Sequence, residues 1–124
     1  MNIIEKVNQL EAKANQFGFT WPDAAMILDQ IRSECDEVAS SMHENESRER
    51  LQEEVGDLVH ATFALCFFLG LDIESTIKSN ADKLEMRLDA LISIAKSKGY
   101  DSLEGETLST KMAFWDMAKK QCSD

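Results

Sequence analysis

Four carboxylates stand in two pairs with three-residue spacing, within the most acidic part of the chain. The first pair is Glu34 and Glu37, and the second is Glu54 and Asp57. Residues three apart lie on the same side of an α-helix, so each pair would project from one face. Four carboxylates gathered in a partly dry site would repel one another, so a cation would have to compensate their charge. Hard oxygen ligands of this kind suit Mg²⁺, which usually also meets substrate phosphates.

The formal net charge of −10 is concentrated around these pairs, since residues 34–57 hold nine acids and two bases. The alternative interpretation is a solvated helix face on which the spacing is accidental. The acidic balance argues against nucleic acid as a partner, because binding phosphates needs a basic surface. It is equally unsuited to an anionic membrane surface, so no membrane partner is expected.

A second group with chemical potential lies further along the chain. Asn80, Lys83 and Arg87 are spaced so that they share one face of a helix. Two cations and an amide on one face can hold a polyphosphate. The alternative is ordinary salt bridging to the acids that stand close by in the sequence.

Apolar residues recur at steps of three and four along most of the chain, which predicts helices and no strands. Counted from their capping residues, the predicted helices cover 2–16, 20–42, 47–69, 72–98 and 107–120. Thr20 is expected to cap the second helix with Pro22 in its first turn, and Ser47 or Asn45 to cap the third. Asp72 is expected to cap the fourth. The 124 residues thus predict one all-α domain, 1–124, a bundle of about five helices.

The three cysteines are odd in number and form no C-x-x-C pair. Cys35 and Cys66 stand among apolar residues at helical spacing and are interpreted as reduced core residues. The N-terminus is of mixed polarity and predicts no signal peptide. The longest apolar run, 61–71, is too short to span a bilayer. A reducing cytoplasm is the expected location.

The segment Ala61–Leu69 is apolar around most of its circumference. We expect it to serve a subunit interface, with a central core helix as the alternative. His60 follows Asp57 by three residues, a spacing that also occurs in carboxylate-bridged di-iron bundles. Such bundles usually carry E-x-x-H on two helices, whereas the first motif here has glutamate at both ends, so this alternative is disfavoured.

From Phe17 to Lys120 the chain resembles the MazG-type all-α nucleoside triphosphate pyrophosphohydrolases. That family carries E-x-x-E, a spacer and E-x-x-D, matched here by Glu34–Glu37 and Glu54–Asp57 with 16 residues between them. The string Glu53–Leu58 is similar to the family's EE-x-GD-L core. Three further matches follow the family order: Trp21-Pro22-Asp23 at the entry, Asn80-x-x-Lys83-x-x-x-Arg87, and the tryptophan-containing end Phe114–Lys119.

The resemblance implies Mg²⁺-dependent hydrolysis of (deoxy)nucleoside triphosphates at the α-phosphorus, with Mn²⁺ as a substitute metal. It implies metal ligation by Glu34, Glu37, Glu54 and Asp57. Of these four carboxylates, Glu37 is our candidate for the group that orients or deprotonates the attacking water. The implied substrate-binding residues are Arg50, Asn80, Lys83, Arg87 and Trp115. Phe17 and Trp21 are candidates for the base pocket, with simple packing in the bundle as the alternative.

The chain has one copy of the motif region, and short members of this family build their sites between protomers. The resemblance therefore implies a homo-oligomer, either a dimer or a dimer of dimers, and a house-cleaning role in the nucleotide pool. One alternative is a non-catalytic helical interaction module that keeps the fold without the chemistry. Another is a related specificity, dUTPase-like or phosphoribosyl-ATP pyrophosphohydrolase, although the tryptophan-bearing tail favours MazG.

Overall fold

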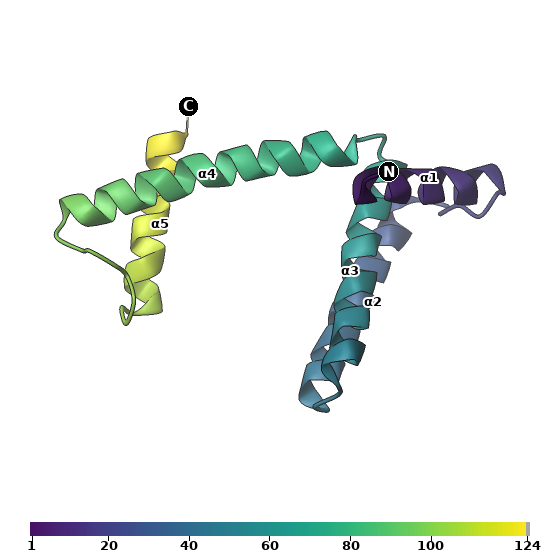
Figure 1. Cartoon of the computed structure of the whole chain (residues 1–124), viewed down its shortest axis with the longest axis horizontal. Coiled ribbons are helices and arrows are strands. Elements are labelled where there is room, and N and C mark those ends of the chain that lie inside the picture. The colour runs from purple at the N-terminus through teal and green to yellow at the C-terminus, as the bar shows by residue number, and fades with distance from the viewer. Residues whose placement is uncertain (124) are drawn as a thin grey trace. The chain divides into compact units, whose positions relative to one another are not determined.

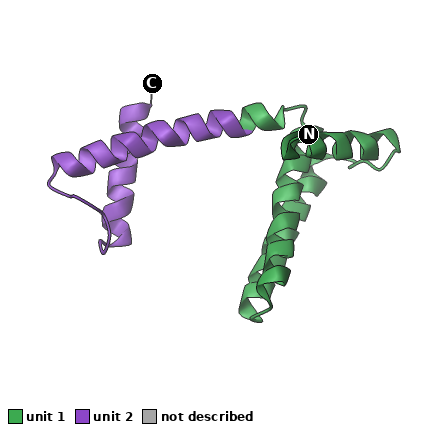
Figure 2. Cartoon of the chain, in the orientation of Figure 1, with its two compact units in different colours: residues 1–76 green, residues 77–124 purple. Residues whose placement is uncertain are grey.

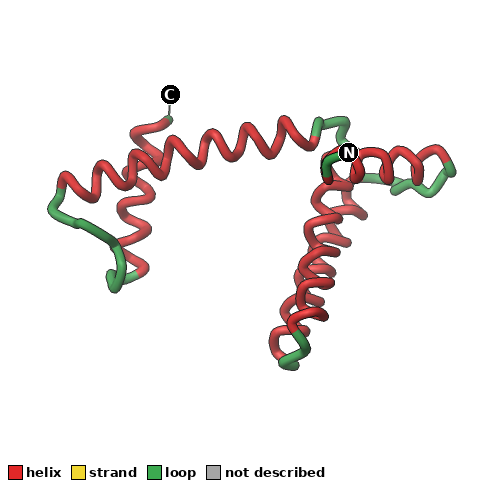
Figure 3. Tube along the Cα trace, viewed as in Figure 1, coloured by secondary structure: helices red, strands yellow, loops and turns green. Residues whose placement is uncertain are grey.

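The computed structural model describes residues 1–123, which form five α-helices and no strand (Figures 1 and 3). The predicted all-α fold is therefore confirmed. The helices are α1 (Ile3–Gln16), α2 (Ala24–His43), α3 (Arg48–Phe68), α4 (Ile73–Ser97) and α5 (Leu108–Cys122). They fall into two compact units, residues 1–76 and the part from Ile77 onward (Figure 2). Each unit is described by itself.

The first unit is built on a hairpin of two antiparallel helices, α2 and α3, which lie side by side, and α1 also packs on α3 (Figure 1). A short turn joins the pair, and within it Asn45 has the left-handed φ of 52°. The most deeply buried large side chains of this unit are Ile27 and Ile73. Ala61 and Ala64 are also buried, and their small side chains let neighbouring helices approach α3 closely.

The face of α2 that is most buried coincides only in part with the apolar stripe that helical periodicity predicts for this helix, namely Leu28, Ile31, Cys35, Val38 and Met42. Ile27, Glu34 and Ser41, seven residues apart, are among the least exposed residues of this helix. Leu28 and Met42, from the predicted stripe, are instead largely exposed. Because Ile31 and Val38 of the stripe are half-buried, packing against α3 uses a face rotated from the stripe by about 60°. A glutamate therefore lies on the inner face of the hairpin.

The start of α2 also differs from prediction, because Asp23 rather than Thr20 caps the helix. Asp23 has an extended backbone, and its carboxylate accepts a hydrogen bond of 2.9 Å from the backbone N–H of Met26. Pro22 lies before the cap and not in the first turn. A residue that precedes proline avoids the helical conformation, so Trp21 stays outside the helix.

Three other predicted caps are confirmed. The hydroxyl of Ser47 accepts from the backbone N–H of Arg50 at 3.2 Å, and Thr107 caps α5 in the same way. Asp72 accepts from both the backbone N–H and the hydroxyl of Ser75, at 2.9 and 2.7 Å. These bonds satisfy backbone donors that a helix start leaves free.

The second unit comprises α4 from Ile77 onward and α5, with its own small core. Its buried apolar side chains are Ala90, Ala95, Phe114 and Ala118. The rings of Tyr100 and Phe114 meet edge to face, with centroids 5.1 Å apart. This aromatic pair connects the loop after α4 to α5.

The three cysteines, Cys35, Cys66 and Cys122, are free thiols. The prediction of a core position for Cys35 is wrong, since this residue is exposed on the face of α2 that the hairpin does not use. Cys66 is half-buried on α3. Within residues 1–123 no single helix has the length and apolarity to cross a membrane, and only the bent pair of α3 with α4 meets that test.

Candidate functional site

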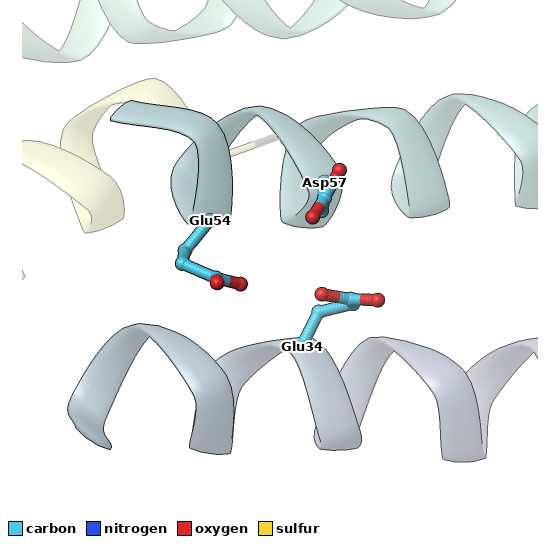
Figure 4. A group of neighbouring side chains, drawn as sticks. All are labelled: Glu34, Glu54 and Asp57. Carbon is cyan, nitrogen blue, oxygen red and sulfur yellow. The ribbon is translucent and has the colours of Figure 1, made fainter. Parts of the chain in front are cut away.

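Three carboxylates converge inside the α2–α3 hairpin (Figure 4). Glu34 comes from the middle of α2, whereas Glu54 and Asp57 come from successive turns near the start of α3. One ligand oxygen from each lies within 4.8 Å of the others. In the close-up, Glu34 and Glu54 extend toward one another across the space between the two helices. We refer to Glu34, Glu54 and Asp57 as the carboxylate triad.

The three side chains of the triad differ in their exposure to solvent. Glu54 is only 8% exposed, Glu34 is half-buried, and Asp57 is open to solvent. Burial is the main cause that raises the pKa of the Glu54 carboxyl above its ordinary value, and the charges of Glu37, Asp57 and Glu34 raise it further. The attraction of Arg50 acts in the opposite direction. The site therefore disfavours additional negative charge and favours a cation.

The chemistry of the triad fits a hard divalent metal ion. All of its donors are carboxylate oxygens, one of them is buried, and the exposed side at Asp57 leaves room for water or substrate. No thiol or imidazole belongs to the cluster in residues 1–123. The donor set therefore suits Mg²⁺ or Mn²⁺ better than a softer metal.

Arg50 lies one turn before Glu54 and is surrounded by carboxylates. Its guanidinium nitrogens lie 3.1 Å from Glu54 Oε1, 3.3 Å from Glu53 Oε2 and 3.5 Å from Glu46 Oε2. These neighbours, Glu54 foremost, raise the pKa of Arg50. The hydroxyl of Ser41 in turn donates to Glu46 at 3.1 Å. Arg50 is therefore a fixed positive charge directly beside the buried member of the triad.

Glu34 has a supporting contact that the sequence patterns did not indicate. Gln30, one turn earlier on α2, donates from Nε2 to Glu34 Oε1 at 2.6 Å. This bond engages one carboxylate oxygen and orients the side chain. Only its position four residues before a predicted ligand could have drawn attention to Gln30.

Glu37 lies one turn beyond Glu34 on α2 and is exposed. It is outside the triad, yet its charge contributes to the raised pKa of Glu54. The structure thus brings three of the four predicted ligands together and leaves Glu37 at their edge, accessible to solvent.

The remaining predicted phosphate ligands belong to the second unit. Asn80 and Lys83 are exposed on α4, and Arg87 is half-buried. The Arg87 guanidinium carbon lies 6.0 Å from the centre of the Trp115 ring, which is a cation–π arrangement. The Nε of Arg87 is buried and finds no hydrogen-bond partner within residues 1–123. The structure therefore joins Arg87 to Trp115, two residues predicted to bind substrate.

The two predicted base-pocket residues have different surroundings. Trp21 is half-buried and lines a cavity of about 770 Å³ in the first unit. Phe17 is 91% exposed and does not line that cavity; it borders an adjoining recess, which shares Leu10, Ala14 and Phe19 with the cavity. His60, considered for a di-iron site, contacts Glu11 at 3.1 Å and lies outside the triad.

A carboxylate cluster within an all-α hairpin defines the chain as a helical protein with a candidate metal site. The profile of the MazG nucleotide pyrophosphohydrolase domain matches residues 23–92, which include the triad and the whole Asn80–Arg87 segment. The chain belongs to this family. Its resemblance to MazG is thereby confirmed.

Comparison with curated proteins finds two similar proteins of one name. The chain is 26% identical over 117 residues to the nucleoside triphosphate pyrophosphohydrolase of Escherichia coli strain K12. The protein of the same name from E. coli O157:H7 matches equally well. In both cases the alignment covers 94% of this chain but 44% of the relative, so the chain spans less than half of the relatives' length.

Proposed function

We propose that this chain hydrolyses nucleoside triphosphates, including deoxynucleotides, at the α-phosphorus, releasing the nucleoside monophosphate and pyrophosphate. The observation that carries the proposal is the carboxylate triad, whose oxygens lie within 4.8 Å of one another. The triad falls inside the segment matched by the MazG profile, and two relatives are named for this activity. A house-cleaning role in the nucleotide pool is consistent with such chemistry.

The metal that we propose is Mg²⁺, held by Glu34, Glu54 and Asp57 with Glu37 at the edge of the set. Mn²⁺ has the same preference for oxygen ligands and would use the same residues. When bound, the metal would supply neutralisation of phosphate charge and a more acidic water.

Other steps of the proposed reaction would be carried out by side chains of this protein. In the reaction a water oxygen bonds to the α-phosphorus, and the bond from that phosphorus to the oxygen of the pyrophosphate group breaks. Glu37, which is exposed beside the triad, is proposed to take the proton of the attacking water. Arg50, Lys83 and Arg87 would stabilise the negative charge of the departing pyrophosphate.

Asn80 and Trp115 have supporting parts in this proposal. Asn80 lies one turn before Lys83 on α4 and would add an amide hydrogen bond to a phosphate. Trp115, whose ring lies 6.0 Å from the Arg87 guanidinium, would hold that group in place for the substrate.

We also propose that residues 1–124 act as a single MazG-like domain in a homodimer or a dimer of dimers. The family match runs across the boundary between the two units, which supports a single domain. Exposed apolar side chains on the hairpin, among them Met42, Val55 and Val59, support association with a second copy. The free thiols suit a reducing cytoplasm. A monomeric mass in solution at micromolar concentration would contradict the oligomer.

The test is a panel of standard and modified nucleoside triphosphates with Mg²⁺, scored for pyrophosphate release. The variants Glu37→Gln and Asp57→Asn should lose this activity and keep the helical circular dichroism spectrum. Asp36→Asn is the matched control, since it removes an exposed acid from α2 that lies outside the triad. Full activity in Asp57→Asn would contradict the metal site, and inactivity of the wild type on every nucleotide would favour the interaction module.

A further inference from the structure

The cavity beside Trp21 has the dimensions and lining of a binding site for a planar ring. It has a volume of about 770 Å³, within the range of small-molecule sites. It is bordered by α1, by the loop before α2, by the first turn of α2 at Met26 and by the C-terminal half of α3. Four aromatic side chains lie in its wall, namely Phe19, Trp21, Phe67 and Phe68. Such side chains offer faces on which a flat heterocycle can stack.

One acidic group lies in the wall of this cavity. Glu11 of α1 is the only carboxylate among the described residues that line the cavity, and its side chain is 14% exposed. His60 Nε2 lies 3.1 Å from its Oε1. The imidazole thus engages one carboxylate oxygen and leaves the other to accept a hydrogen bond from a ligand. The remaining polar side chains of the wall, Asn15 and Thr20, can both donate and accept.

The cavity continues the candidate metal site along α3. His60 and Ala64 line it and follow Asp57 by three and seven residues, on the same face of the helix. At 1.5 Å per residue they lie about 5 and 11 Å further along the helix axis. A nucleotide with its phosphates at the triad therefore has its base within reach of the cavity.

We propose that this cavity holds the nucleobase and that Glu11 selects bases that carry an amino group where uracil, thymine and hypoxanthine carry an oxo group. The inference rests on the proposed function for the position of the phosphates. Trp21 stacks on the base, while the Glu11 carboxylate accepts a hydrogen bond from its amino group. His60 is a positioning residue that orients Glu11.

The selection follows from the hydrogen-bonding capacity of a carboxylate. An ionised glutamate accepts hydrogen bonds and donates none. The amino groups of cytosine and adenine supply the donor, whereas uracil, thymine and hypoxanthine carry an oxo group, which is another acceptor, at the same ring position. With an oxo group opposite Glu11, the complex would lack a charge-assisted hydrogen bond, and the oxo oxygen and the carboxylate would face each other as two hydrogen-bond acceptors.

The experiment uses substrates that differ in one group, compared as kcat/KM with Mg²⁺ and the full chain. The first pair is dCTP and dUTP, and the second is dATP and dITP. The wild type should prefer the amino member of each pair by about tenfold or more. Glu11→Gln should narrow both preferences to within about threefold, because the amide can also donate. Glu5→Gln, an exposed change on the same helix, should leave them unchanged.

Binding of the monophosphates separates this inference from the proposed function. Titration with dCMP and dUMP, followed by NMR through the Trp21 indole N–H, should give tighter binding of dCMP in the wild type and equal binding in Glu11→Gln. Hydrolysis without an amino preference overturns the role of Glu11 and leaves the pyrophosphohydrolase intact. Inactivity on all triphosphates overturns the proposed function, while the titration still decides the base preference. Equal binding of both monophosphates to the wild type overturns the inference.

Discussion

Replacing Glu54 with glutamine should raise the stability of the metal-free protein and reduce the stabilisation that a bound metal ion adds. Glu54 is the buried member of the triad, and its pKa is raised by burial and by the neighbouring carboxylates. The folded chain therefore keeps this group ionised at a cost. Glutamine has nearly the same shape and no charge, so the variant removes both the unfavourable free energy of the buried charge and one metal ligand.

The size of the metal effect can be worked out by mass action. With Mg²⁺ at about ten times its Kd, binding stabilises the native wild type by about 1.4 kcal/mol. For a chain of 124 residues this corresponds to a rise in Tm of about 4–8 °C. Loss of one of three close carboxylates should weaken binding by about tenfold or more. The same Mg²⁺ concentration would then raise the Tm of Glu54→Gln by only about 1–2 °C.

Without metal the variant should melt higher than the wild type at neutral pH. Because the folded pKa of Glu54 is raised, protonated Glu54 adds stability that is fully present below the ordinary glutamate pKa of about 4.3. That stability is lost as pH rises through the higher folded pKa. The variant also loses the ion pair with Arg50, which reduces its gain in stability. The causes that raise the pKa of Glu54 nevertheless outweigh the attraction of Arg50, so a net gain remains. The two proteins should therefore melt alike in acid and diverge as pH rises.

The assay is thermal unfolding by circular dichroism across a pH series, with Mg²⁺ and with a chelator. Glu53→Gln is the matched control, since Glu53 is the adjacent exposed glutamate and also contacts Arg50. It should keep the metal-induced rise in Tm. A Glu54→Gln variant that retains the full rise would refute metal binding by the triad. A lower Tm for that variant without metal would refute the cost assigned to the buried charge.

Three further predictions concern single side chains. Arg50→Gln should tighten the binding of Mg²⁺ alone, measured by calorimetry, because it removes a competing cation from the buried carboxylate of Glu54. The same variant should reduce turnover of the nucleotide. Weaker Mg²⁺ binding would contradict this prediction. Ile27→Ala should lower the free energy of unfolding in urea by about 2–5 kcal/mol because the side chain is fully buried, and Ile27→Val by about 0.5–1.5 kcal/mol. Asp72, whose pKa is lowered by hydrogen bonds from Ser75, should add stability that is present above its ordinary pKa and lost as pH falls through its folded pKa. Asp72→Asn should remove that part of the acid dependence, and an unchanged pH profile of Tm would exclude this contribution.

The helices were largely predictable because their signals are local. Ser47, Asp72 and Thr107 cap helices as expected, since a side chain needs to reach only two or three residues along the chain. The start of α2 was mispredicted because Thr20 and Asp23 both suit a cap. The conformation imposed before Pro22 and the path of the chain decide between them.

The candidate site was predictable only in part, because periodicity describes a helix face and not its partner. The paired spacing indicates that Glu54 and Asp57 share a side of one helix. The inner face of α2 is rotated by about 60° from the apolar stripe, so Glu34 points into the hairpin and Cys35 outward. The packing of two particular helix surfaces decides this rotation, and no single-helix pattern contains it.

The sequence by itself determined that the chain is all-α, which residues carry the motifs of the family and where the charge is concentrated. Those properties depend on residue type and on spacing within about two helical turns. Only the tertiary structure decided that Glu34 meets Glu54 and Asp57, that Arg87 lies beside Trp115, and that His60 contacts Glu11. These contacts join residues 20 or more positions apart. They form because helices pack through whole surfaces, so their partners follow from how the faces fit together.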